Sequence, residues 1–157
     1  MIMSPCCSLV TPIGTLRLVA GGNGLTALSW DEGGCANLEP SDPQLLLARE
    51  ELRQYFSGEL RNFTVKVDFS RWQGFTARVY TALFAVPYGE TITYGELARR
   101  AGQPAAARAV GGIMARNPLP IILPCHRVIA ANGALTGYSG GAGIATKVFL
   151  LNHEKAS

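Results

Sequence analysis

The stretch that organises this chain is residues 117–128, Asn-Pro-Leu-Pro-Ile-Ile-Leu-Pro-Cys-His-Arg-Val, an apolar run ending on a Cys-His pair. Proline fixes its own φ and restricts the residue before it, so the sequence predicts a stiff, extended segment. The thiol of Cys125 beside the imidazole of His126 suits nucleophilic chemistry, because the thiolate is the nucleophile and a neighbouring base can form it. The alternative is a buried structural cysteine beside a core histidine, since unpaired cysteine is among the most buried residue types.

The segment before this run predicts two short helices joined by a turn. Thr93 and Glu96 have the spacing of a capping box, which opens a helix that ends near Gly102. Pro104 stands where the next helix begins, and that helix is expected over residues 105–116. The pair fits a helix-turn-helix, whose second helix would contact DNA, although such pairs also occur in plain helical cores.

Small side chains dominate the second of these helices. Residues 105–112 read Ala-Ala-Ala-Arg-Ala-Val-Gly-Gly, with Arg108 as the single long cation. Small residues permit a close backbone approach, so this helix can lie in a DNA groove with the guanidinium inserted. Close packing against the protein's own core, with Arg108 merely exposed, is the alternative, and the residues alone barely separate the two.

Residues 1–72 predict a structural α/β domain in which no chemical constellation is found. The expected elements are strands over 16–20 and 25–30 around a turn at 21–24, a helix over 42–56 capped by Asp42, and a strictly alternating strand over 63–69. Residues 73–157 form the second predicted domain, with further helices over 75–84 and 145–154 and a turn at Asn132-Gly133. The fold class expected from this order is α/β, of the α+β kind.

Composition favours a folded protein whose basic charge lies in the second half. Hydrophobic residues make up 48% and charged residues 16% of the chain, which argues against disorder. Residues 1–73 hold six Lys and Arg against eight Asp and Glu, a net −2, whereas residues 74–157 hold eight against three, a net +5. Such a half suits a polyanion, although ordinary fluctuation gives similar differences. No apolar run reaches the roughly 18 residues of a membrane span, and no signal peptide is evident at the N-terminus.

Residues 75–154 resemble the O6-alkylguanine-DNA alkyltransferases, also called methylated-DNA–protein-cysteine methyltransferases. Pro124-Cys125-His126-Arg127-Val128 reads as the active-site signature of that family, and residues 107–112 look like its recognition helix. The resemblance implies direct-reversal DNA repair, in which an alkyl group moves irreversibly from O6-alkylguanine to Cys125 and each molecule acts once; repair of O4-alkylthymine is left open. It also implies a ribonuclease-H-like N-terminal domain and a winged-helix-like C-terminal domain.

The same resemblance implies catalytic roles for five residues. Cys125 would attack the alkyl carbon, and His126 would accept the thiol proton through a water molecule. Glu154 would orient the imidazole, as the third member of a nucleophile–base–orienter set. Asn117 would fix the active-site turn, and Tyr94 would assist protonation of the leaving guanine.

Further residues are implied in DNA binding and in the substrate pocket. O6 inside a duplex is inaccessible to in-line attack, so the nucleotide must be extruded. Arg108 would fill the vacated space from the minor groove, and Tyr94 would crowd the 3′ phosphate. The DNA-binding set is Tyr94, Ala107, Arg108, Ala109 and Gly111, and the pocket set is Pro120, Val128, Tyr138 and Ser139. The Gly-rich loop that closes over the base is two residues longer here than in many family members.

Double-stranded DNA containing O6-alkylguanine is the implied partner, with no cofactor, metal or membrane. A monomer is expected, with cooperative binding on DNA left open, in a reducing cytoplasm that keeps the nucleophilic thiol reduced. Two other functions are considered. One is a lesion-binding relative that does not repair, a class that lacks the acceptor cysteine. The other is a cysteine hydrolase, for which adjacent residues of an extended segment point awkwardly to opposite faces.

Overall fold

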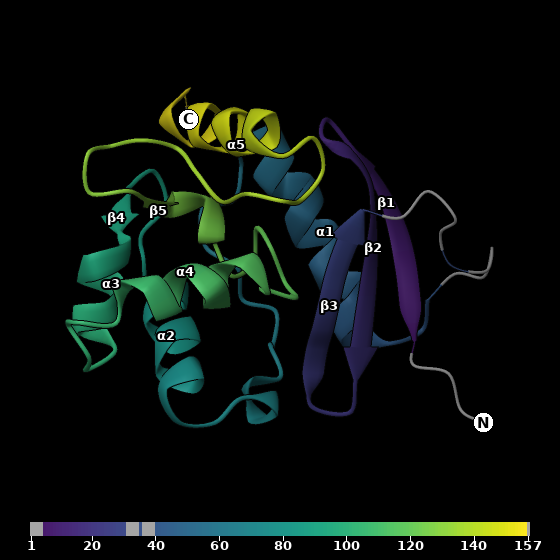
Figure 1. Ribbon diagram of the computed structural model, residues 1–157. Coiled ribbons are helices and arrows are strands. Elements are labelled where there is room, and N and C mark those ends of the chain that lie inside the picture. The colour runs from purple at the N-terminus through teal and green to yellow at the C-terminus, as the bar shows by residue number, and fades with distance from the viewer. Residues whose placement is uncertain (1–4, 31–34, 36–39, 157) are drawn as a thin grey trace. The chain divides into compact units, whose positions relative to one another are not determined.

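The chain divides into two compact units, Met1–Ser70 and Arg71–Ser157, and Figure 1 shows the elements of each. The computed structural model describes residues 5–30, 35 and 40–156. The first unit holds a small sheet and one long helix, and the second holds short helices around a two-stranded pair. This mixed content confirms the α+β class expected from the sequence.

The sheet of the first unit is a three-stranded antiparallel meander in the order β1-β2-β3. Its strands are β1 Cys6–Thr11, β2 Gly14–Gly21 and β3 Gly24–Trp30. The two predicted strands are confirmed, whereas β1 was not predicted. Glycine is required at Gly24, because its φ is +118° and a Cβ there would stand 2.5 Å from the carbonyl oxygen of Lys66. A disulfide joins Cys6 to Cys35.

Helix α1, Pro43–Ser57, packs against β1 and β2. It begins as predicted, because the Asp42 carboxylate accepts hydrogen bonds from the amides of Gln44 and Leu45. It ends at Gly58, whose φ of 85° suits a left-handed cap. Its apolar face is fully buried, at Leu45, Ala48, Leu52 and Tyr55.

The strand predicted over residues 63–69 was wrong. Only one residue pair, Leu25 and Val67, bridges there, and residues Phe69–Arg71 form a 3₁₀ turn, η1. The cause lies in α1, where the carboxylate of Glu51 accepts hydrogen bonds from the amides of Thr64 and Val65 at 2.9 Å each. Those amides are therefore not available to a neighbouring strand, and an alternating pattern alone does not reveal this competition.

The second unit contains the predicted helices and a short parallel strand pair. Its elements are α2 Gly74–Phe84, β4 Ile92–Thr93, α3 Tyr94–Arg100, α4 Ala107–Ala115, the 3₁₀ turn η2 Cys125–Arg127, β5 Val128–Ile129 and α5 Ile144–Ala156. Strand β4 pairs with β5, and α3 packs against α4 as a helix-turn-helix requires. Among the described residues, no helix is long and apolar enough to cross a membrane.

Helix α3 begins with half of the predicted capping box. The Thr93 hydroxyl accepts from the amide of Glu96 at 3.1 Å. The Glu96 carboxylate does not complete the box but accepts from the guanidinium of Arg99, at 2.7 Å from Nε and 2.5 Å from Nη2. Hydrogen bonds from Arg99, and further from Arg100, lower the pKa of Glu96 to about 2.

Candidate active site

The segment that carries Cys125 is a buried, folded turn and not the extended segment that its prolines predicted. Every residue from 119 to 128 is buried, and Cys125–Arg127 forms the 3₁₀ turn η2. Ile121 has a φ of 76°, a left-handed conformation that β-branched residues rarely adopt and that costs on the order of 1–3 kcal/mol. This conformation lets the chain double back, so that the amide of Leu123 donates to the carbonyl of Leu119 at 2.8 Å.

Asn117 ties this turn together from the end of α4. Its side-chain amide donates to the carbonyl of Leu123 at 2.8 Å, and its side-chain oxygen accepts from the amide of Leu119 at 2.9 Å. Asn117 also hydrogen-bonds to the thiol of Cys125. The side chain therefore links the C-terminal end of α4 to the cysteine, which is 9% exposed.

His126, Arg127 and Glu154 form a buried charged cluster beside the cysteine. The Nε2 atom of His126 lies 2.7 Å from Oε2 of Glu154. The Arg127 guanidinium donates to both oxygens of the same carboxylate, at 2.8 Å from Nε and 2.9 Å from Nη2. An ionised carboxylate only accepts hydrogen bonds, so the proton of the imidazole is assigned to Nε2 and Nδ1 is the basic nitrogen. Nδ1 is buried and has no hydrogen-bond partner among the described residues.

The pKa shifts in this cluster favour a neutral thiol, a neutral imidazole and an ionised carboxylate. Burial raises the pKa of Cys125, and the Asn117 hydrogen bond and the charge of Lys147 oppose it only in part. Burial lowers the pKa of His126 and outweighs the opposing pull of Glu154. Burial alone would raise the pKa of Glu154, but hydrogen bonds from His126 and Arg127 leave it below its usual range.

Lys147 is a site residue that the sequence analysis did not identify. It is 1% exposed, and its ammonium donates to the carbonyls of Val128 at 2.7 Å and Thr136 at 2.8 Å. Burial lowers the pKa of Lys147, whereas the charge of Cys125 raises it, so the two groups are electrostatically coupled. The spacing of Lys147, Leu150, Leu151 and Glu154 places both charges on the apolar face of α5, and that pattern would have revealed the lysine.

We call residues 136–143 the lid, the yellow-green loop that leads into α5 in Figure 1. The carbonyl of Thr136 in the lid accepts two hydrogen bonds. One comes from the ammonium of Lys147, and the other comes from the hydroxyl of Tyr94 at 3.3 Å. Gly137 has a φ of +72°, and a Cβ there would stand 3.2 Å from the Tyr94 hydroxyl, so the tyrosine rests directly on the lid. Tyr138 is 8% exposed. Burial raises its pKa most, and the charge of Cys125 raises it further.

The other predicted pocket residues lie around this turn with one exception. Pro120 is buried and bridges to Leu123, and Val128 is buried with its carbonyl already bound by Lys147. The carbonyl of Cys125 accepts from the amide of Val128. The carbonyls of Val128 and Cys125 each keep a second lone pair, with which they can accept another hydrogen bond. Ser139 is exposed on the lid.

Four of the predicted DNA-binding residues lie on α4 outside its buried face, whereas the fifth, Tyr94, begins α3. Val110, Ile113 and Met114 form that buried face. Arg108 and Ala109 are exposed, whereas Ala107 and Gly111 are half-buried. Arg108 forms no hydrogen bond or ion pair with any residue that the structure describes. The helix therefore offers a smooth surface with one protruding cation.

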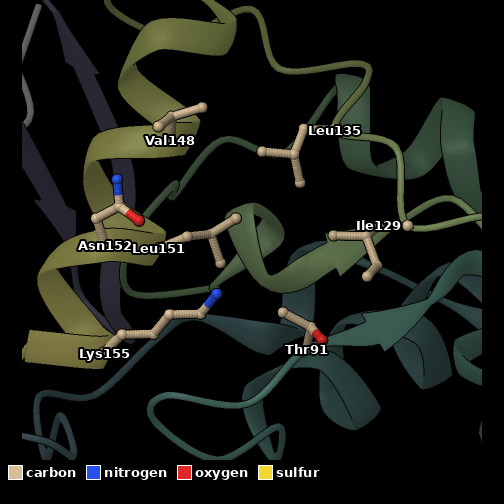
Figure 2. A pocket seen from close by; sticks show the side chains of 8 residues that line it. Thr91, Ile129, Leu135, Val148, Leu151, Asn152 and Lys155 are labelled. Carbon is tan, nitrogen blue, oxygen red and sulfur yellow. The ribbon is translucent and has the colours of Figure 1, made fainter.

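A shallow pocket of about 290 Å³ lies in the same unit but outside the cysteine cluster. Figure 2 shows side chains of α5 facing the loop that follows β5 across it. Its lining residues are Thr91, Ile129, Gly133, Leu135, Val148, Leu151, Asn152 and Lys155. None of the residues predicted to be catalytic lines it.

Two family models cover almost all of the chain. The DNA binding domain of 6-O-methylguanine DNA methyltransferase matches residues 74–156. The ribonuclease-like domain of 6-O-methylguanine DNA methyltransferase matches residues 7–69. The two matches therefore fall on the two units that the structure contains.

Relatives with known names match over nearly their whole length. The methylated-DNA–protein-cysteine methyltransferase of Mycobacterium leprae is 43% identical over 98% of this chain and 93% of that protein. The crystal structure of Mycobacterium tuberculosis O6-methylguanine methyltransferase has a TM-score of 0.83 at 45% identity, covering 98% of this chain and 94% of that one. A crystal structure of the Mycobacterium tuberculosis protein in complex with DNA also has a TM-score of 0.83, at 46% identity, covering 96% and 92% of the two chains. This chain therefore belongs to the 6-O-methylguanine DNA methyltransferase family.

Proposed function

We propose that this chain repairs DNA directly, by moving the alkyl group of O6-alkylguanine onto its own Cys125. The observation that carries the proposal is the buried thiol in the family's signature turn, next to a histidine whose second nitrogen binds an ionised carboxylate. Relatives named methylated-DNA–protein-cysteine methyltransferase and a relative solved with DNA support it.

The chemical step is an in-line displacement at the alkyl carbon. The Cys125 proton passes through a water molecule to Nδ1 of His126, and the sulfur attacks as the C–O6 bond breaks. Glu154 stabilises the imidazolium that forms, because its carboxylate already accepts from Nε2. Guanine leaves with the bonding electrons and regains a proton, a step that Tyr94 assists. The product is a thioether, which no group of this chain reverses, so each molecule acts once.

The acceptor must be reached by a base that has left the duplex. At 9% exposure, Cys125 is inaccessible to a stacked guanine, so extrusion of the nucleotide and opening of the lid precede the transfer. Arg108 takes the vacated place in the stack, and Tyr94 presses on the 3′ phosphate. Such a wedge offsets part of the few kcal/mol that unstacking costs.

Small residues on α4 let its backbone approach the minor groove. Ala107, Ala109 and Gly111 surround Arg108, and no atom lies within 4 Å of a Cβ built at Gly111. Tyr138 provides an apolar wall of the base pocket, Ser139 hydrogen-bonds near O6, and Pro120 and Val128 shape its floor. Within the lid, the amide of Gly143 donates to the carbonyl of Gly140 at 2.9 Å.

The working compartment is the reducing cytoplasm, because Cys125 must remain a thiol to act. Such a compartment would also keep Cys6 and Cys35 reduced, and their disulfide does not involve the acceptor. The chain binds double-stranded DNA as a monomer and needs no cofactor, because the substrate itself carries the alkyl group.

The test is intact-protein mass spectrometry after incubation with duplex DNA carrying O6-methylguanine. We expect one added methyl group per chain, mapped to Cys125, at a stoichiometry that never exceeds one. DNA binding without a mass shift would instead indicate a lesion-binding protein. Neither binding nor a shift would remove the repair function and leave a cysteine hydrolase to be tested.

A further inference from the structure

Arg127 is the one charged residue of the signature turn for which no function has yet been argued. Its side chain is almost fully buried, and its guanidinium makes the two-pronged contact with Glu154 described above. A third hydrogen bond, from Nη1 to the carbonyl of Val86, measures 2.7 Å, and the ring of Tyr88 lies 5.7 Å from the guanidinium carbon. Every one of these contacts fixes the guanidinium in one place.

The carboxylate of Glu154 is therefore shared between two cationic partners. Its Oε2 atom accepts from both His126 and Arg127, and its Oε1 atom accepts from Arg127 and from the amide of Gly89 at 3.2 Å. These hydrogen bonds include two from the Arg127 guanidinium, so the negative charge of the carboxylate is already balanced by a group that does not titrate. A buried carboxylate facing an imidazole alone would instead draw a proton onto the imidazole.

This matters because the mechanism needs a vacant Nδ1 atom on His126. A histidine that already carries both protons cannot accept one from the thiol. The charged side chains that act on the His126 imidazole are Arg127 of η2 and Glu154 and Lys147 of α5. Of these, only Glu154 favours the protonated imidazole, and Arg127 is the residue that binds Glu154 directly.

We propose that Arg127 is a positioning residue that keeps the His126 imidazole neutral, and so able to accept the thiol proton, by occupying the carboxylate of Glu154. The inference rests on the proposed alkyl transfer, since it assigns His126 the role of base. It also gives the arginine a function distinct from that of Lys147, which acts on the thiol.

The experiment follows the imidazole directly, in full-length protein labelled with ¹⁵N-histidine. The chain has only two histidines, His126 and His153, so their NMR titrations are easily separated. Arg127→Met removes the charge, and Arg127→Lys keeps the charge but loses the two-pronged contact. Arg78→Met is the control, because this exposed arginine also donates its Nε to a backbone carbonyl, that of Ala101 at 2.9 Å, and does not contact the carboxylate. Single-turnover methyl transfer is measured on the same samples from acid to alkaline pH.

We expect Arg127→Met to move the midpoint of the His126 titration upward by at least one pH unit. The pH below which transfer slows should move upward with it, so that at a pH below both midpoints transfer falls about tenfold and recovers as the pH is raised, since one unit is a tenfold change in the protonation equilibrium. Arg127→Lys should give a smaller upward shift, and Arg78→Met should give none. If Arg127→Met does not fold, the Arg127→Lys profile decides between a loss confined to low pH and a uniform one.

An unmoved midpoint, or a loss of rate that is equal at every pH, would reduce Arg127 to a structural residue and overturn the proposal. The proposed function fails separately, if wild-type protein transfers no methyl group to Cys125. The two failures are therefore distinguishable in one set of samples.

Discussion

Among the residues that the structure describes, each unit buries one glutamate, and the two glutamates have different kinds of partners. Glu51, 4% exposed in α1, accepts from the amides of Thr64 and Val65 and from the hydroxyl of Thr64. Glu154, 3% exposed in α5, accepts from the ionisable side chains of His126 and Arg127. Both carboxylates are fully hydrogen-bonded, as burial requires.

The difference teaches which buried charges serve stability and which serve chemistry. Partners that do not titrate fix a carboxylate in one state, so Glu51 holds the 64–65 segment to α1 and nothing more. A partner that exchanges a proton, as His126 does, makes the carboxylate part of a reaction, because protonation of that partner changes the charge that the carboxylate faces. The same contrast applies to the two buried thiols, Cys7 and Cys125.

The largest expected effect separates those thiols. Cys125→Ala should abolish methyl transfer completely while leaving binding to methylated duplex DNA intact. Cys7→Ala should transfer one methyl group at the wild-type rate, because Cys7 belongs to the sheet of the first unit. Mass spectrometry and a gel-shift titration measure both, and any methylation of Cys125→Ala would contradict the assignment of the acceptor.

The two glutamates are compared next, as Glu154→Gln and Glu51→Gln. We expect Glu154→Gln to slow single-turnover transfer by about 100-fold, the lower range for loss of general-base assistance. Glu51→Gln should transfer at the wild-type rate but lose about 1–3 kcal/mol of unfolding free energy, because its amide group would face the Thr64 amide. Equal rates in the two variants would break the comparison.

A smaller effect on the transfer rate is expected when the buried Lys147 is replaced. Lys147→Met removes a charge that lowers the pKa of Cys125, so that pKa should rise further and the thiolate become scarcer at neutral pH. We expect transfer about tenfold slower, equivalent to one pKa unit, with recovery as the pH is raised. The control is Lys66→Met in the first unit, an exposed lysine that should leave the rate unchanged.

The smallest predicted effect concerns the lid. Tyr94→Phe removes one hydrogen bond to the Thr136 carbonyl, while Lys147 keeps the other. A single bond of this kind is worth about 1 kcal/mol, so amide exchange in the lid should accelerate about fivefold. Hydrogen-exchange mass spectrometry without DNA measures this, with Tyr88→Phe as the control. Unchanged exchange would show that Tyr94 does not restrain the lid.

Local sequence signals predicted most of the fold, because they depend on a residue and its near neighbours. The cap at Asp42, the left-handed glycine at Gly58 and the hydroxyl cap at Thr93 each act within four residues. The strand over 63–69 was wrong because Glu51, far away in sequence, captured its amides. The unpredicted strand β1 pairs with β2 through a register set by the whole sheet.

The sequence motif predicted which residues form the candidate site, but it did not predict the buried charges around them. The residues of the signature turn and Glu154 meet as the resemblance implied. The burial of Lys147 and Arg127 was not predicted, because a charged side chain is expected at the surface unless its position among apolar residues is considered. The 3₁₀ turn at Cys125 was not predicted, because prolines indicate that a segment is stiff but not which way the chain bends. The bend depends on the positive φ of Ile121.

The burial of Cys125 also determines how long an unused molecule stays active. A protein that works once is lost if any other electrophile or oxidant reaches its sulfur first. A buried, neutral thiol reacts slowly with small reagents in solution, since the thiolate is the reactive form. The repair capacity of a cell then follows the number of chains that it has made, because few are consumed by accident between one lesion and the next.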